Sequence, residues 1–261
     1  MTVFKKELRA YFASFLVWTA GVGGLMAVCV WMYPSFSDSM EDVSALFAGM
    51  GDFSAAFGLD KLAFGSVMGF YGTECGNILG LGGAFFAALT GMGLLAGEEG
   101  DRTAEFLLTH PAPRLRVALE KLGALAALVL GLNLVCFACG AGSILAIGEE
   151  ADWGDLLRYH GAVLLMQMEV GGLCFGLSSL LRRSSFGLAL GLAAMLYFLG
   201  IFINLDAGLE PLKFLTPYYY ADAARVFSGE VEVLPVLTGC ALGLGGGALG
   251  LWWYGRKDIA A

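Results

Sequence analysis

Residues 122–147 read LGALAALVLGLNLVCFACGAGSILAI, a long run without a charged side chain. An α-helix rises about 1.5 Å per residue, so about 20 apolar residues cross a bilayer core about 30 Å thick. The run is long enough to do this, and it lacks the alternation of apolar and polar residues that is typical of a barrel strand. It therefore predicts a transmembrane helix.

Five further runs along the chain have similar length and composition. The predicted spans are residues 15–33, 77–96, 122–147, 161–181, 186–204 and 234–254. Overall, 58% of the residues are hydrophobic, only 15% are charged, and the mean hydropathy is +0.74, which excludes an ordinary soluble domain. We predict an all-α membrane protein, with residues 1–261 forming one domain, a six-helix bundle. No small-residue cleavage site closes the first run, so it is expected to be a retained span.

The basic residues predict the orientation of this bundle. With a cytoplasmic N-terminus, the inner set is Lys5, Lys6, Arg9, Arg102, Arg114, Arg116, Lys121, Arg182, Arg183, Arg256 and Lys257. The outer set is Lys61, Arg158, Lys213 and Arg225. This asymmetry follows the positive-inside rule and predicts that both termini are cytoplasmic. The chain has no basic stripe with interleaved aromatic residues, so nucleic acid is not an expected partner.

Three segments outside the spans carry helical patterns. Phe4, Leu8 and Tyr11 recur at helical spacing and predict an amphipathic helix at the inner interface, although a simple extension of the first span explains them almost as well. The long outer loop 34–76 and the aromatic outer loop 205–233 predict interfacial helices at the outer side.

The most polar segment lies between the second and third spans and reads GEEGDRTAEFLLTHPAPRLRVALEK, residues 97–121. We predict a short amphipathic helix over residues 98–109. Acidic residues occupy its first turn, where the helix dipole favours anions, Glu98 and Arg102 are spaced for an ion pair, and Pro111 ends it. The alternative is a solvated connector.

The pattern EEGDRTAEFLLTHPAPR resembles the signature that follows the second span of type-2 ABC exporter permeases. Glu98, Thr103, Glu105, Leu107, Leu108, Pro111 and Arg114 hold the positions of that signature. The KKELRAYF opening, the six spans and the LTPYYY segment extend the resemblance over nearly the whole chain. Arg102 occupies a position where the family commonly has glycine.

The resemblance implies a permease subunit in a bacterial or archaeal plasma membrane, with a second permease copy and a separate ABC ATPase as partners. The helix 98–109 would then be the coupling helix that docks on the ATPase. The residues implied in coupling are Glu98, Glu99, Arg102, Thr103, Glu105, Leu107, Leu108, Pro111 and Arg114. The chain has no GxxxxGK[ST] phosphate-binding loop, so ATP and Mg²⁺ would be bound by the partner. We expect no cofactor in the chain, and it is not expected to be an enzyme.

Glu169 is an acidic residue in the middle of a predicted span. Insertion of such a charge costs about 2.5–3.5 kcal/mol, so the side chain must be protonated, paired or facing water. Asn133 and Gln167 are candidate neighbours. Glu169 is a candidate for the translocation path or for a structural hydrogen bond between helices. Two alternative functions stay open: a proton-coupled secondary transporter that uses Glu169, and a non-transporting membrane scaffold or sensor.

Glycines at four-residue spacing predict close helix contacts, within the chain or between subunits. They are Gly172 and Gly176, Gly187 and Gly191, and Gly239, Gly243 and Gly247. Cys136 and Cys139 form a CxxC within a span, without a second pair or a nearby histidine, so we interpret both as packing residues and expect no metal site.

Overall fold

The protein is seen here in a computed structural model that describes residues 2–36, 65–100 and 113–257, together with Met50, Gly51, Ser54, Ala56 and Leu62. For Thr2 and residues 98–100 it describes the backbone alone. The described helices are α1 (Thr2–Phe36), α4 (Val67–Phe70), the π-helix η2 (Tyr71–Cys75), α5 (Gly76–Gly100), α7 (Arg114–Ile147), α8 (Trp153–Leu180), α9 (Phe186–Leu205), the 3-10 helix η3 (Ala207–Phe214), α10 (Ala223–Ser228) and α11 (Val233–Arg256).

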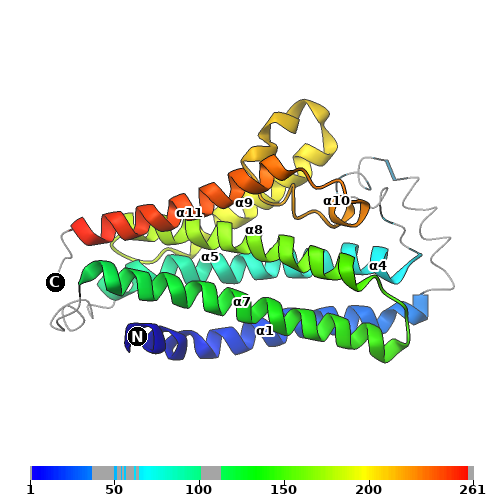
Figure 1. Cartoon of the computed structure of the whole chain (residues 1–261), viewed down its shortest axis with the longest axis horizontal. Helices are drawn as coiled ribbons and strands as arrows, with labels where there is room; N and C mark the ends of the chain where they lie inside the picture. Colours follow the sequence, from blue (N-terminus) through cyan, green and yellow to red (C-terminus); the bar gives the residue numbers. More distant parts are fainter. Residues whose placement is uncertain are drawn as a thin grey trace.

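Six of the described helical stretches are long and apolar enough to cross a membrane, which confirms the predicted six-span, all-α architecture. They are α1, the continuous stretch α4–η2–α5, α7, α8, α9 and α11. The beginning of α1 and the end of α11 lie at the same end of the elongated bundle, and α4 and α10 lie at the opposite end (Figure 1). Below, these ends are called the terminal end and the distal end.

The helix boundaries follow the capping residues of the chain. Ser66 accepts a hydrogen bond from the Gly69 amide at the start of α4, Asp152 caps α8, and Ser185 caps α9. Gly148 ends α7 with a φ of 78°, a conformation that glycine adopts without a steric penalty.

Four spans are longer than hydropathy predicts. The N-terminal residues form the first turns of α1 and are continuous with the first span, which agrees with the alternative of a simple helical extension. The second helical stretch begins at Val67 rather than at residue 77, and α7 begins at Arg114 rather than at residue 122. Helix α8 begins at Trp153 rather than at residue 161. Some polar side chains of the extra turns are paired, among them Glu7 of α1 with Lys121 and Asp155 of α8 with Arg158. Most of the interfacial helix predicted in loop 34–76 lies outside the described residues, whereas η3 and α10 occupy the loop 205–233.

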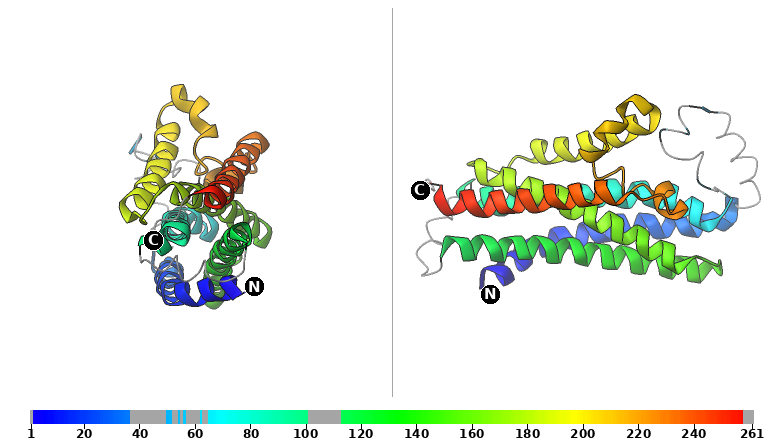
Figure 2. Two further views of the ribbon diagram at one scale, coloured as in Figure 1. Left: turned by 90° about the vertical axis from the view of Figure 1, so that its left-hand side faces the viewer. Right: turned by 45° about the horizontal axis from the view of Figure 1, so that its top comes forward.

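The centre of the bundle is formed by α5 and α8. In each of these two spans, about two thirds of an apolar stretch of 18 residues is buried inside the protein. In the other four spans the buried share of such a stretch is 22–39%. Gly91 of α5 lies directly against the Gly171 carbonyl of α8, an approach that a side chain at Gly91 would prevent. In the end-on view of Figure 2, α9 and α11 lie on one side of this centre and α1 and α7 on the other.

Polar side chains inside the bundle pair with one another. The Asn133 amide donates to Gln167 Oε1 at 2.7 Å, and Gln167 Nε2 donates to the Leu79 carbonyl at 3.1 Å. Closer to the distal end, the hydroxyl of Tyr71 lies 2.8 Å from Nε2 of His160. These bonds link α5, α7, α8 and η2 where water is excluded and an unpaired polar group would be costly.

Candidate functional site

Helix α5 ends and helix α7 begins at the terminal end (Figure 1), and the segment predicted to couple to an ATPase lies between them in the sequence. Helix α5 continues past the predicted end of the second span at residue 96 and includes Glu98 and Glu99 in its last turn. Arg114 is the first residue of α7. The other predicted coupling residues lie outside the described residues; they are Arg102, Thr103, Glu105, Leu107, Leu108 and Pro111. The described geometry therefore concerns the two ends of this segment.

Side chains of neighbouring helices hold the last turns of α5. Ser178 Oγ of α8 accepts hydrogen bonds from the amides of Leu95 and Ala96 at 3.3 and 2.9 Å. Lys121 Nζ of α7 donates to the adjacent Leu94 carbonyl at 2.7 Å. Three consecutive residues just before the coupling segment are thus bonded to α7 and α8 through their backbones.

Lys121 is completely buried, although the charge distribution placed it among the cytoplasmic loop cations. Its ammonium group forms an ion pair with Glu7 of α1 at 2.9 Å. The pairing corrects the sequence prediction, because a lysine enclosed by a carboxylate and a carbonyl can remain inside a helix bundle. Glu7 lies one helical turn from both Val3 and Tyr11, on the inward face of α1, and that spacing was the signal for its burial.

Glu120, next to Lys121, binds the N-terminus of α1. Its Oε2 accepts hydrogen bonds from the amides of Val3 and Phe4 at 3.0 and 3.1 Å, and its Oε1 accepts one from Arg116 at 3.2 Å. These amides have no partner within their own helix, and the positive end of the helix dipole favours the carboxylate. The first turn of α1 is thereby fixed to α7.

Arg114 joins the start of α7 to the end of α11. Its Nη1 donates to the Lys257 carbonyl at 2.8 Å, and Lys257 Nζ donates in turn to the Leu181 carbonyl after α8 at 2.6 Å. Together with the contacts of Lys121, Ser178 and Glu120, these bonds connect α1, α5, α7, α8 and the end of α11 around the coupling segment.

This arrangement can be compared with known proteins. Residues 1–258 match the family described as ABC-2 family transporter protein. The chain belongs to the ABC-2 transporter family. No curated protein matches the chain. Members of the ABC-2 family are membrane-spanning permease subunits of ABC transporters and are not themselves ATPases; in general they work with an ABC ATPase. The six apolar helices agree with a multi-pass membrane protein of this kind.

In this ABC-2 permease, Glu169 lies inside the membrane-spanning part of α8 and is 2% exposed. Its Oε2 accepts a hydrogen bond from the hydroxyl of Tyr220 at 3.0 Å, across to the segment before α10. Gln167 and Asn133 bond to each other instead, because residues two positions apart on a helix point in very different directions.

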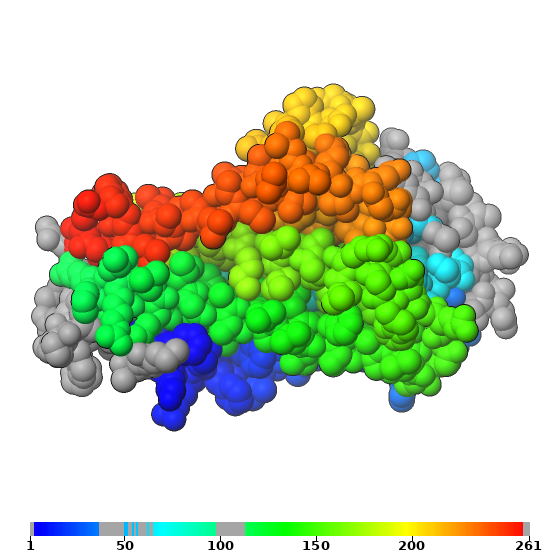
Figure 3. Space-filling model, in the orientation of Figure 1, coloured from blue at the N-terminus to red at the C-terminus, as the bar shows by residue number. Residues whose placement is uncertain are grey.

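Glycines of α11 leave the space that the Glu169 side chain occupies. Gly239 lies against its carboxylate, and a Cβ on Gly243 would lie 2.7 Å from the Glu169 Cα. Beside this contact, a largely apolar groove of about 520 Å³ runs between α7, α8 and α11 and includes Glu169 in its lining. In Figure 3, α11 and α8 appear side by side on the face that carries α7. Glu169 thus borders a groove as well as forming a bond between segments.

The cysteine pair of the third span packs against α1. All six cysteines are free, and a Cβ on Gly23 would lie 3.2 Å from the Cys139 sulfur and 3.8 Å from that of Cys136. Among the residues that the structure describes, no group of three or more His, Cys, Asp or Glu side chains could hold a metal ion. The described geometry gives the CxxC a packing role.

Proposed function

We propose that this permease is the membrane subunit of an ATP-driven exporter, and that residues 98–114 dock on a separate ABC ATPase that binds ATP and Mg²⁺. The observation that carries the proposal is the bonding at both ends of this segment, by Lys121 and Ser178 at α5 and by Arg114 at α7. Helix ends bonded in this way transmit a displacement of the segment to the spans.

The family and the coupling signature support this role. Under the proposal, closure of the ATPase moves residues 98–114, and the bonds to α1, α7, α8 and α11 distribute that movement through the bundle. The terminal end would then face the cytoplasm of a bacterial or archaeal cell, with both chain termini on that side. The cations of the terminal end favour this orientation.

A second permease copy would complete the transporter. A Cβ on Gly187 or Gly191 of α9 would meet no described atom of another element within 4 Å, whereas Gly172 and Gly176 of α8 pack against α11. The two glycines lie on an exposed face of α9, where another helix could approach closely. We therefore assign the α8–α11 glycines to packing within the chain and propose α9 as a surface for the second copy.

Charge reversal in the coupling segment tests the proposal. The permease is reconstituted with the ABC ATPase that copurifies with it, and ATP hydrolysis is compared with and without the permease. Glu105→Lys should remove the stimulation of hydrolysis by the permease, because a docking contact becomes repulsive. Glu150→Lys is the control, since Glu150 is exposed in the turn between α7 and α8 at the distal end. Unchanged stimulation in Glu105→Lys would count against docking by this segment.

Glu169 is proposed to lie on the translocation path, because it borders the groove between α7, α8 and α11. Glu169→Gln retains an oxygen that can accept the Tyr220 hydrogen bond but removes the ionisable group. We expect at least a tenfold loss of ATP-dependent transport with unchanged ATPase binding and folding. Full transport by Glu169→Gln would contradict a role in translocation, and the hydrogen bond to Tyr220 would then be the role that the structure supports.

A further inference from the structure

A second apolar groove runs between α1 and α5, on different helices from the groove that Glu169 borders. It has a volume of about 590 Å³, and none of its lining residues carries a charge. The two helices approach closely at one side of it, where a Cβ on Gly82 would lie 2.8 Å from Val22 Cγ2. Gly21 of α1 leaves the groove open, because no described atom lies within 4 Å of the position of its Cβ.

An acidic side chain lies just beyond the distal end of this groove. Glu74 of η2 precedes Ile78, a lining residue, by about one helical turn. It also lies near Cys29 of α1, which is one turn beyond the lining residue Leu25. Glu74 is exposed, and its carboxylate forms no hydrogen bond or ion pair within the part of the chain that the structure describes. The carboxylate is therefore free to bind a molecule that enters the groove.

The position of Glu74 along its helix corresponds to the boundary of one membrane leaflet. Twenty residues separate it from Leu94, next to the coupling segment, which is about 30 Å of helix and equals the thickness of a bilayer core. Exposed Trp31 follows Cys29 by two residues, and tryptophan is enriched at membrane interfaces. The groove extends to Phe85, 11 residues or about 16 Å from Glu74, so it spans about half of the core.

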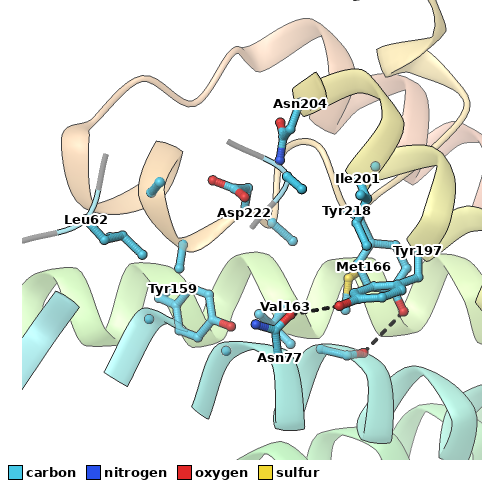
Figure 4. Close-up of a pocket in the computed structure, with 18 residues that line it drawn as sticks. Leu62, Asn77, Tyr159, Val163, Met166, Tyr197, Ile201, Asn204, Tyr218 and Asp222 are labelled. Atoms are coloured by element: carbon cyan, nitrogen blue, oxygen red, sulfur yellow. Dashed lines mark hydrogen bonds between the residues drawn. The ribbon is translucent and has the colours of Figure 1, made fainter. Parts of the chain in front are cut away.

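Asn77, which also lines the groove, has its polar atoms engaged within the chain. Its Nδ2 donates to the Thr73 carbonyl at 2.8 Å, and its Oδ1 accepts a hydrogen bond from the Tyr197 hydroxyl at 3.0 Å. The same residue lines a small cavity of about 80 Å³ at the distal end, between α5, α8 and α9 (Figure 4). Asn77 thus joins α5 to α9 beside this distal cavity, and Glu74 is the charged group at the end of the groove.

We propose that a phospholipid with a primary ammonium headgroup binds here, with its acyl chain in the groove and its ammonium group on Glu74. A primary ammonium has three N–H donors and a positive charge, so it complements a carboxylate that has no other cation. The apolar lining and the depth of one leaflet fit an acyl chain.

Other occupants fit this groove less well. Glu74 would repel an anionic headgroup, and a quaternary ammonium has no N–H group to donate. A helix of a second copy would take the Glu74 carboxylate out of water, which is costly without a paired cation. The proposed site is independent of ATPase docking, and its test contains no ATPase.

Competition between lipids tests the proposal on the purified full chain. The permease in detergent micelles receives equal amounts of phosphatidylethanolamine, phosphatidylcholine and phosphatidylglycerol with identical acyl chains, and native mass spectrometry counts the lipids that it retains. Gly21→Leu fills the groove, so a lipid lost in this variant is the one bound there. We expect the loss of one phosphatidylethanolamine molecule. An equal loss of either other lipid, or no loss, would overturn the proposal.

Gly24→Leu is the matched control for the filled groove. Gly24 is exposed on α1 and has nothing within 4 Å of its Cβ position, but it does not line the groove. This variant should retain phosphatidylethanolamine as wild type does. If Gly21→Leu separated a dimer into monomers without changing lipid retention, the groove would be a contact between copies, which contradicts the proposal.

Glu74→Gln tests the headgroup contact separately from the groove. It removes the charge at nearly constant size, and we expect retention of phosphatidylethanolamine in the groove to fall at least fivefold. The thermal unfolding midpoint without added lipid should stay unchanged, because Glu74 has no described partner to lose. Glu150→Gln is the control, since Glu150 is an exposed distal-end acid that does not line the groove. Retention equal to that of wild type in Glu74→Gln would contradict the assignment of the headgroup.

Discussion

Lys121 is the residue whose environment differs most from what its chemistry suggests. A cation at the boundary between a polar segment and an apolar run would ordinarily face water or lipid headgroups. Here it is fully buried between Glu7, which is 114 positions away in the chain, and the Leu94 carbonyl. The ion pair therefore belongs to the packing of α1, α5 and α7 next to the coupling segment.

Loss of one partner of this pair should destabilise the bundle. Lys121→Met leaves the Glu7 carboxylate buried without its cation, and we expect the free energy of unfolding to fall by about 3 kcal/mol, as for other broken buried pairs. Equilibrium unfolding of the purified chain in mixed micelles measures the change. The double variant Lys121→Met/Glu7→Gln should recover a large part of the loss, because no unpaired charge remains. Equal losses in the single and double variants would argue against the ion pair as the cause.

At the scale of elements, α8 and α11 show how glycine sets the distance between two helices. A Cβ on Gly176 would lie 2.6 Å from the Gly246 carbonyl, and a Cβ on Gly246 would lie 2.5 Å from the Gly172 carbonyl. These neighbours are backbone atoms, which cannot move aside as a flexible side chain can. The helices therefore pack backbone to backbone along this contact.

Adjacent glycines of α11 provide a matched test of this packing. Gly246→Ala should destabilise the protein by about 1–3 kcal/mol, because the added methyl group forces α11 away from α8. Gly245→Ala adds the same methyl group where nothing lies within 4 Å, and alanine is the better helix former by about 1 kcal/mol, so stability should stay equal or rise. Unfolding midpoints of the two variants measure the difference. Similar effects at both positions would contradict the close contact.

A polar cluster joins η3 to the start of α11 at the distal end. Lys213 Nζ lies 2.7 Å from Glu232 Oε2, and the Tyr219 hydroxyl donates to Glu232 Oε1 at 2.7 Å. The hydrogen bond from Lys213 holds the pKa of the Glu232 carboxyl below its ordinary value, with a smaller contribution from Tyr219. The bond to Glu232 likewise raises the pKa of Lys213.

The sign of the pH dependence follows from these directions. Because the pKa of Glu232 is lowered in the folded state, its stabilising contribution is present above the ordinary glutamate pKa and is lost as the pH falls through the lowered value. The contribution of Lys213 is complete below the ordinary lysine pKa and is lost only as the pH rises through its raised value. Thermal unfolding followed from pH 7 down to pH 3 should show a smaller acid-induced decrease for Glu232→Gln than for wild type. Identical acid profiles would exclude this contribution.

At the scale of the whole molecule, six spans place the two ends of the chain on one side of the membrane. The structure shows α1 beginning and α11 ending at the same end of the bundle (Figure 1). We expect fluorescent-protein fusions at the C-terminus to be bright, as they are on the cytoplasmic side, and alkaline phosphatase inserted at Glu150 to be active. If alkaline phosphatase is active at the C-terminus and inactive at Glu150, the orientation is opposite to the predicted one.

The sequence predicted the class of fold and several span boundaries, because hydropathy and length depend on local composition. The ends of α7 and α8 and both ends of α9 lie within one residue of the predicted positions. The coupling signature also pointed to the family that the comparison confirms, because its residues have fixed spacing. The docking role of residues 98–114 stays a prediction, since most of them lie outside the described part of the chain.

Tertiary structure alone decided which distant side chains meet. The Glu7–Lys121 ion pair, the bond from Tyr220 to Glu169 and the distal cavity each join residues from different helices. Hydropathy and spacing describe one helix at a time and carry no information on the rotation of one helix relative to another. The sequence by itself therefore determined how many helices are long and apolar enough to cross the membrane and where α7, α8 and α9 end, whereas packing between them determined which charges are buried and where a cavity remains.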